Sequence, residues 1–160
     1  MMKIAKITAA VLMLFTLTAC AVRQKYTSGL TNGVVATTEF KAEDGMTMRP
    51  EGTTLIVKKD NENVIALFYI TKDVFYDMAE SIKDSEAEIV ESTEKKVVYK
   101  LAHDGINEYS AILLVDDDTA CVVSGEITET NTEETIVKAI NNLVIKTKHA
   151  KTEADESEKG

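Results

Sequence analysis

The acidic run Asp116-Asp117-Asp118 is the one cluster in this 160-residue chain whose side chains have a physical reason to bind an ion. Three adjacent carboxylates on a tight turn repel one another, and a divalent cation such as calcium would relieve that repulsion. The spacing differs from that of an EF-hand loop, and exposed turns tolerate such runs. We therefore treat Asp116, Asp117 and Asp118 as candidates only, and predict no metal or cofactor.

Residues suited to metal binding, nucleophilic catalysis or nucleotide binding give less support for a functional site. His103 stands beside Asp104 in a predicted hairpin turn and His149 lies near the carboxyl end, and neither has a second metal ligand close in sequence. Ser124-Gly125 lacks the other glycine and the strand-turn-helix context of a nucleophile elbow. The sequence contains no glycine-rich phosphate loop and no dinucleotide fingerprint. It therefore predicts a protein that is not an enzyme.

The first 19 residues are typical of an export signal. Lys3 and Lys6 provide a short positive region, and an apolar run from Ile7 to Leu17 follows. That run holds about a dozen residues, whereas a membrane-spanning helix needs about 20. It ends at a small residue followed by Cys20, and the sequence then turns polar. We therefore predict a signal peptide over residues 1–19.

The motif Leu17-Thr18-Ala19-Cys20 resembles the lipobox of bacterial lipoproteins, in which an aliphatic residue, a small or hydroxyl residue and Ala or Gly precede a cysteine. The resemblance implies diacylglycerol on Cys20, cleavage between Ala19 and Cys20, and acylation of the new amino terminus, for example with palmitate. Two or three acyl chains hold a protein stably on a membrane. Ala21, by resemblance to Gram-negative sorting, implies the outer membrane; in a host with a single membrane, the outer face of that membrane is expected.

Net charge limits the partners of this chain. The formal charge is −9, and without Lys3 and Lys6 the mature chain would hold 16 basic and 27 acidic residues, a net charge of −11. Nucleic-acid phosphates require clustered Lys and Arg, so we expect no nucleic-acid partner. The same balance predicts that anionic lipid repels the domain and that the acyl group alone holds it at the membrane.

Composition divides the mature chain into three parts. Residues 20–33 are poor in apolar side chains and predict a flexible tether after Cys20, residues 34–146 carry the pattern of a single domain, and the charged residues 147–160 predict a disordered tail. If Cys20 is acylated, Cys121 is the remaining cysteine, so no intrachain disulfide is expected. Cys121 lies among small and apolar residues and is predicted to be buried.

Two helical patterns interrupt a series of strand patterns in the domain. The first helix follows Thr71, a predicted N-cap, and runs to about residue 83. The second begins with a capping-box-like pair, Asn131 and Glu134, and continues as an apolar stripe. That stripe consists of Ile136, Val137, Ile140, Leu143 and Val144.

The remaining pattern predicts an α+β fold, a mainly antiparallel sheet of about six to seven strands with two helices packed on it. Turns are expected at Arg49-Pro50-Glu51-Gly52 and at Asp104-Gly105, the latter a residue pair that suits a type I′ hairpin. The predicted strands cover residues 34–40, 53–58, 64–71, 88–92, 96–102, 109–116 and 119–128.

About half of the chain, from the first predicted helix to the second, resembles uncharacterised small bacterial lipoprotein domains of unknown function and, more loosely, PsbP-like domains. The resemblance implies an antiparallel sheet flanked by helices and supplies no catalytic residues. It rests on Phe75-Tyr76-Asp77-Met78, on Asn107-Glu108-Tyr109 with the run Val115 to Asp118, and on Val123-Ser124-Gly125-Glu126-Ile127.

These observations together predict a lipid-anchored envelope lipoprotein that contacts the membrane through the lipid on Cys20 and has a non-enzymatic binding or assembly role toward another envelope protein. The alternative is a small-molecule or ion-binding lipoprotein with a pocket between the sheet and a helix. An exposed apolar patch would favour the first hypothesis, and an enclosed pocket the second. The tyrosines expected to line such a pocket are Tyr69, Tyr76, Tyr99 and Tyr109.

Overall fold

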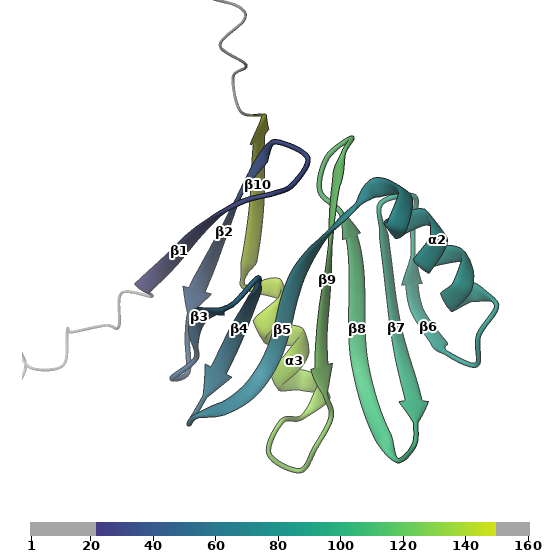
Figure 1. The fold of residues 1–160 in the computed structure, drawn as a ribbon. Helices are drawn as coiled ribbons and strands as arrows, with labels where there is room; N and C mark the ends of the chain where they lie inside the picture. Colours follow the sequence, from purple (N-terminus) through teal and green to yellow (C-terminus); the bar gives the residue numbers. More distant parts are fainter. Residues whose placement is uncertain (1–21, 150–160) are drawn as a thin grey trace, which may run out of the picture.

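The computed structural model describes residues 22–149, which form two antiparallel sheets and two helices (Figure 1). The predicted α+β fold with a mainly antiparallel sheet is therefore confirmed. Neither helix in this range is long and apolar enough to cross a membrane. In chain order the elements are β1 (Val22–Gly29), β2 (Val34–Ala42), β3 (Thr47–Glu51), β4 (Thr54–Lys59), β5 (Glu62–Thr71), α2 (Lys72–Lys83), β6 (Glu88–Ser92), β7 (Lys96–His103), β8 (Ile106–Leu114), β9 (Thr119–Glu126), α3 (Glu133–Asn141) and β10 (Leu143–His149).

The larger sheet has seven strands in the order β3-β4-β5-β9-β8-β7-β6. All but one of its neighbouring pairs join strands that follow one another in sequence; the exception is β5 with β9, which brings residues 66–71 beside residues 119–124. Strand β8 lies inside the sheet. Its consecutive residues Ala111 and Ile112 point to opposite faces, and both are fully buried. This agrees with the apolar residues that the sequence places on both of its faces.

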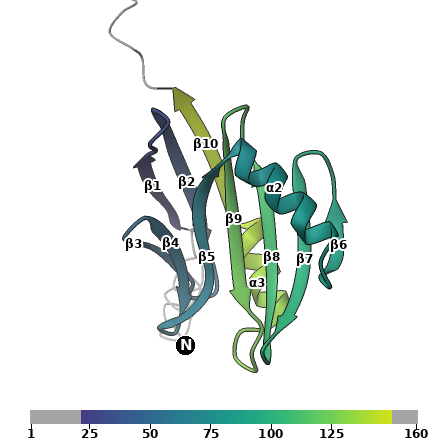
Figure 2. The same cartoon turned by 45° about the vertical axis from the view of Figure 1, so that its right-hand side comes forward.

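Helix α2 covers one face of the seven-stranded sheet (Figure 2). The Thr71 hydroxyl caps it as predicted, because its oxygen accepts a hydrogen bond from the Val74 N–H at 3.5 Å. Burying one large apolar side chain stabilises a fold by about 1.5–3 kcal/mol, so the buried stripe of α2 is enough to hold it on the sheet. Phe75, Ala79 and Ile82 form this stripe and pack with Val97, Ile112 and Val122.

Helix α3 and the smaller sheet cover the opposite face. Ile136 and Ala139 of α3 are fully buried in the core. The helix ends at Asn141, so the prediction that Val144 belongs to its apolar stripe is wrong. Val144 lies in β10 and is 47% exposed, and Leu143 also belongs to that strand.

The predicted start of α3 is wrong by one residue. Thr132 is the N-cap, and its hydroxyl accepts a hydrogen bond from the Thr135 N–H at 3.3 Å. Asn131 is buried instead, and its side-chain amide donates to the carbonyl oxygens of Val64 at 3.0 Å and Glu126 at 2.8 Å. Asn131 therefore joins the loop before α3 to two strands of the sheet, since buried carbonyl groups require donors.

The predicted tether over residues 20–33 is wrong for residues 22–29, which form β1. This strand pairs with β2 from Val22 to Gly29. Its side chains also reach the edge strand β3: the Tyr26 hydroxyl donates to the Met48 carbonyl oxygen at 2.8 Å, and the Met48 N–H donates to the side-chain oxygen of Gln24 at 2.5 Å. Backbone groups at a sheet edge need partners, and β1 supplies them to β3.

The predicted disordered tail begins too early, because β10 extends to His149. It pairs with β2 on the side opposite β1, so β2 is the middle strand of a three-stranded sheet. The domain therefore extends beyond both ends of the predicted range 34–146, and the other predicted tail residues lie outside the described range. The residues of β10 that fall in the predicted tail are Thr147, Lys148 and His149, paired with Ala36, Val35 and Val34.

Of the turns predicted at residues 49–52 and at Asp104-Gly105, the second is confirmed and the first is shorter than expected. Asp104 and Gly105 have φ values of 50° and 81°, and positive φ at both positions is what a type I′ turn requires. The other prediction is wrong for residues 49–51, which belong to β3, and the chain turns at Gly52, where φ is 63°. Pro50 is compatible with β3 because this is an edge strand.

Candidate functional site

The first of the three acidic candidates closes the turn between β8 and β9. The Asp116 carboxylate accepts hydrogen bonds from the N–H groups of Asp118 at 2.9 Å and Thr119 at 2.7 Å. Burial raises the pKa of Asp116, but hydrogen bonds from the Thr147 side chain and from these backbone groups outweigh it and hold the pKa below its usual 3.8. Asp116 therefore has a structural role that links this turn to β10.

The other two acidic residues are exposed at the same turn. Asp118 lies 3.6 Å from the Nε2 atom of His149, and Asp117 points into solvent. Within residues 22–149, no group of three or more His, Cys, Asp or Glu side chains is arranged to hold a metal ion. The structure thus places the three carboxylates together without assembling a ligand set from them.

The remaining reactive side chains lie on different elements. His103 is at the end of β7, exposed, and 2.9 Å from Asp104. Ser124 lies within β9, opposite Ala66 of β5 and Ser110 of β8. Burial raises the pKa of the Cys121 thiol to about 12, and this side chain is fully buried as predicted. Ala19 and Cys20, the predicted cleavage and lipidation residues, lie outside the described residues.

The four tyrosines expected in one pocket are separated by the fold. Tyr99 packs beneath α2, whereas Tyr109 packs on the opposite face of the sheet with the α3 cluster. Tyr76 is 48% exposed on α2, where its ring packs edge to face against Phe75. The prediction of a pocket shared by these residues is therefore wrong. Tyr109 lines a pocket of about 230 Å³ beside α3, and Tyr69 lines a separate, larger groove.

That groove, here called the β5 groove, has a volume of about 620 Å³ and opens between the two sheets. Three segments contribute its walls: the end of β1 with the following loop, the β3–β4 turn, and the last residues of β5. Because consecutive side chains of β5 point to opposite faces, a wall that contains four of them in a row follows the edge of the strand. The lining residues are Ser28, Gly29, Leu30, Thr31, Asn32, Gly52, Thr53, Thr54, Phe68, Tyr69, Ile70 and Thr71.

The edge of β5 is open along this groove. Strand β4 begins at Thr54, and its pairing with β5 extends only to the partners Leu55 and Leu67. Residues 68–71 of β5 pair with β9 on their other side. The backbone of these four residues therefore faces the groove where a further strand of the sheet would otherwise lie.

The chemistry of the groove is neutral. Its lining contains hydroxyl, amide, aliphatic and aromatic side chains, and none of the 12 lining residues is acidic or basic. Phe68 is 38% exposed there. The Tyr69 hydroxyl is hydrogen-bonded to Thr38 of β2, which fixes one wall, and burial raises the pKa of Tyr69 despite this bond.

The sequence pattern does not reveal this groove. Tyr69 is one of the four predicted pocket tyrosines, and Phe68 falls within the predicted strand 64–71, where most of its neighbours are apolar. The early end of β4 pairing depends on the β3–β4 turn and on where β1 lies, and neither is encoded in the β5 sequence itself. Comparison of the chain with protein-family models, with curated proteins and with solved structures gives no match.

Proposed function

We propose that this chain is a lipid-anchored protein of the bacterial envelope with a non-enzymatic binding role, and that it binds an extended segment of another envelope protein in the β5 groove. The observation that carries the binding role is the open edge of β5 at residues 68–71 inside a groove of about 620 Å³. The lipobox resemblance of Leu17-Thr18-Ala19-Cys20 supports the anchor and the envelope location.

Strand addition is the binding mode that an open sheet edge favours. In this mode main-chain hydrogen bonds provide affinity, and pockets for alternate side chains provide specificity. Phe68 is exposed beside the edge and would supply an aromatic contact, the kind of residue that concentrates binding energy in interfaces. The proposed partner segment is uncharged where it enters the groove, because a charge desolvated without a counter-charge is costly.

Site-specific photo-crosslinking in the native host tests the binding role. A photoreactive phenylalanine analogue at Phe68 should give one dominant adduct with an envelope protein. The same analogue at Tyr76, an exposed aromatic residue on α2, is the matched control and should not give that adduct. An identical adduct pattern from both positions, or none from Phe68, would contradict binding at the groove.

Fatty-acid labelling tests the anchor separately. Cys20→Ala should leave an unprocessed precursor that incorporates no labelled fatty acid. Cys121→Ala should be processed and labelled as wild type, because Cys121 is buried in the folded core. Labelling that survives Cys20→Ala would refute the anchor without bearing on the groove.

A second candidate function is the binding of a small uncharged molecule in the same groove. The volume of the groove lies within the range of roughly 300–1,000 Å³ that is common for ligand sites, and its lining combines hydroxyl and amide groups with the aromatic rings of Phe68 and Tyr69. Native mass spectrometry of protein extracted from its own membranes would distinguish the two. A bound small molecule that is lost in Phe68→Ala would favour this alternative over a protein segment.

A further inference from the structure

The outer face of the three-stranded sheet concentrates positive charge. Along β1, β2 and β10 alternate side chains point either to the core or to solvent. Tyr26, Thr38 and Phe40 are among those on the inner side, where they contact the larger sheet or its core. The basic residues at outward positions, here called the basic face, are Arg23 and Lys25 of β1, Lys41 of β2, and Lys146 and Lys148 of β10.

The strand register places these five cations around two carboxylates. Arg23 is directly opposite Lys41, and Lys25 is opposite Glu39. Glu39 lies 3.7 Å from Arg23 and 3.1 Å from Lys146, and the hydrogen bond from Lys146 is the main reason that the Glu39 pKa is lowered. Lys41 forms an ion pair with Glu43 at one end. Five positive and two negative side chains leave the face with a net positive charge.

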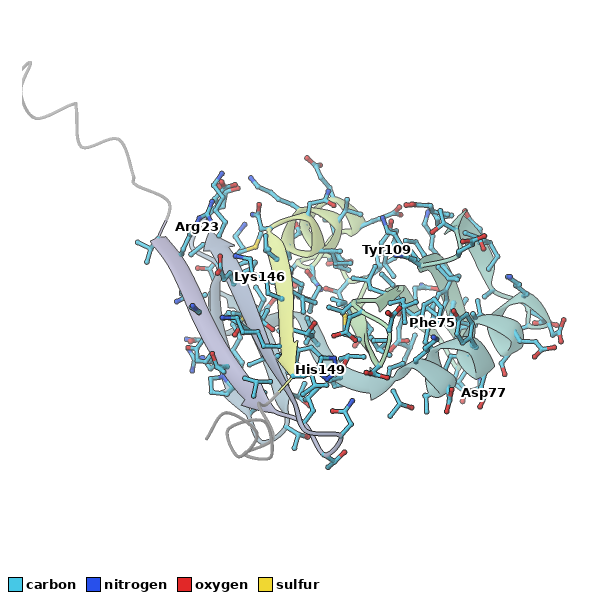
Figure 3. All side chains as sticks on the ribbon, turned by 90° about the horizontal axis from the view of Figure 1, so that it is seen from above. Arg23, Phe75, Asp77, Tyr109, Lys146 and His149 are labelled. Carbon is cyan, nitrogen blue, oxygen red and sulfur yellow. The ribbon has the colours of Figure 1, made fainter. Side chains whose placement is uncertain are left out.

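The positive charge of the basic face is unexpected in a chain whose formal net charge is −9, and it lies apart from the acidic residues of α2. Figure 3 shows Arg23 and Lys146 on the small sheet and Asp77 on α2, at opposite ends of the molecule. The exposed side of α2 carries Asp73, Asp77 and Glu80. The molecule therefore has a dipolar charge distribution, with a positive end at the small sheet and a negative end at α2. The net charge of the whole chain does not give the local charge of either end.

The basic face lies next to the proposed acylation site. Strand β1 begins at Val22, two residues after Cys20, and two residues of extended chain span about 7 Å. Arg23 is the first outward-pointing cation of the strand, and its side chain is 73% exposed. A lipid on Cys20 would thus bring one corner of the basic face within reach of the membrane surface.

We infer that the basic face rests on the anionic phospholipid headgroups of the membrane that holds the acyl anchor. This inference depends on the proposed acylation of Cys20. Clustered Lys and Arg beside an anchor are attracted to anionic lipid within about one Debye length, roughly 8 Å at physiological salt. The sequence-based expectation that lipid repels the domain applies to the acidic α2 end, which then points away from the membrane.

This orientation leaves the β5 groove accessible. The groove lies at the end of β1 that is farther from Cys20, and Tyr69 in its wall bonds to Thr38 on the inner side of the small sheet. Eight residues of β1 extend over about 25 Å, which separates the groove from the anchor. The membrane therefore covers the outer face of the sheet while a partner reaches the groove from its other side.

Lysine labelling of the full mature protein, extracted from its own membranes, tests this orientation in vesicles. The protein is reconstituted in phosphatidylcholine alone or with phosphatidylglycerol added, and brief acetylation is read out for each lysine by mass spectrometry. We expect Lys25, Lys146 and Lys148 to react at least about threefold more slowly on the anionic vesicles, and high salt to abolish the difference. Lys83 and Lys95, on α2 and before β7, are internal controls and should react equally on both.

Each other outcome points to a distinct conclusion. Equal labelling of the basic face on both vesicles, or protection that high salt leaves unchanged, would overturn the inference. Protection by a soluble acidic protein but not by anionic vesicles would also overturn it and assign the face to a protein partner. Protein that washes off both kinds of vesicle would refute the acyl anchor, which is the proposed function rather than the orientation.

Discussion

Removal of the Tyr26 hydroxyl tests whether β1 is a strand of the folded domain. This hydroxyl donates a 2.8 Å hydrogen bond to the carbonyl oxygen of Met48, a residue that is only 1% exposed. A hydrogen bond contributes about 0.5–1.5 kcal/mol net, and an acceptor that loses its partner in a fully buried site costs about 1–3 kcal/mol. Tyr26 itself is half-buried, so water reaches part of this site. We expect Tyr26→Phe to lower the free energy of unfolding by about 1 kcal/mol.

Urea unfolding followed by far-ultraviolet circular dichroism measures this change. With an m-value of about 1.5 kcal/mol/M, the midpoint should fall by about 0.7 M urea. Tyr76→Phe removes the same atom from a tyrosine that is 48% exposed on α2, and should change stability by less than about 0.5 kcal/mol. If the two variants unfold at the same urea concentration, β1 is not docked on β3 and the tether prediction for residues 22–29 is restored.

Three further measurements examine the core and the β8–β9 turn. Gly125→Ala should lower the free energy of unfolding in urea by about 1–3 kcal/mol, because the added Cβ would lie 2.4 Å from the Val64 carbonyl oxygen. At Gly29 an added Cβ meets no heavy atom within 4 Å, so Gly29→Ala is the control and should be nearly neutral. Similar losses of stability in both variants would contradict the close packing at Gly125. Iodoacetamide at about pH 8 should leave Cys121 unmodified in the native protein and alkylate it in concentrated urea, because the thiol is buried and burial raises its pKa to about 12. Rapid alkylation of the native protein would mean that the core opens. The folded state lowers the pKa of Asp116, so its stabilisation is present above the unfolded pKa near 3.8 and is lost as pH falls through the folded value. Asp116→Ala should therefore be less stable than wild type at pH 7, and the two stabilities should converge near about pH 2. An equal difference in stability at both pH values would exclude the carboxylate charge as the source of the stabilisation.

The elements that could be predicted are those whose local pattern agrees with their final environment. Thr71 caps α2, and Phe75 and Ile82 recur at helical spacing on the side that meets the sheet. Asp104 and Gly105 tolerate positive φ, so the hairpin between β7 and β8 follows from the residues of the turn. In these cases short-range preferences and long-range packing favour the same structure.

The elements that were missed depend on partners distant in sequence. Strand β1 has few apolar residues, and its order comes from pairing with β2 and from the bonds of Gln24 and Tyr26 to Met48. Residues 147–149 of β10 resemble the charged residues that follow them until β2 lies beside them, and Leu143 and Val144 continue the apolar stripe of α3 by residue type. Asn131 suits a helix cap by residue type, but two carbonyl acceptors in the folded chain bind its side chain instead.

The candidate sites divide in the same way. The acidic run from Asp116 to Asp118 was visible in the sequence, but its role in closing a turn required the position of the Thr119 N–H. The β5 groove was not visible, because it exists only where β4 stops pairing and the loop after β1 approaches. Whole-chain composition also concealed the basic face, since a net charge does not record which strand residues alternate toward solvent.

Residue patterns are enough to predict the α+β class, α2, the Asp104-Gly105 turn and the burial of Cys121, and they carry the lipobox resemblance. The folded chain was needed to find that residues 22–29 and 147–149 lie in strands, that the four tyrosines are apart, and that five cations share one face. The difference lies in the range of the interactions. Helix periodicity, capping and turn preferences act over a few residues, whereas sheet pairing, groove walls and charged faces join segments more than 100 residues apart, such as Glu39 and Lys146.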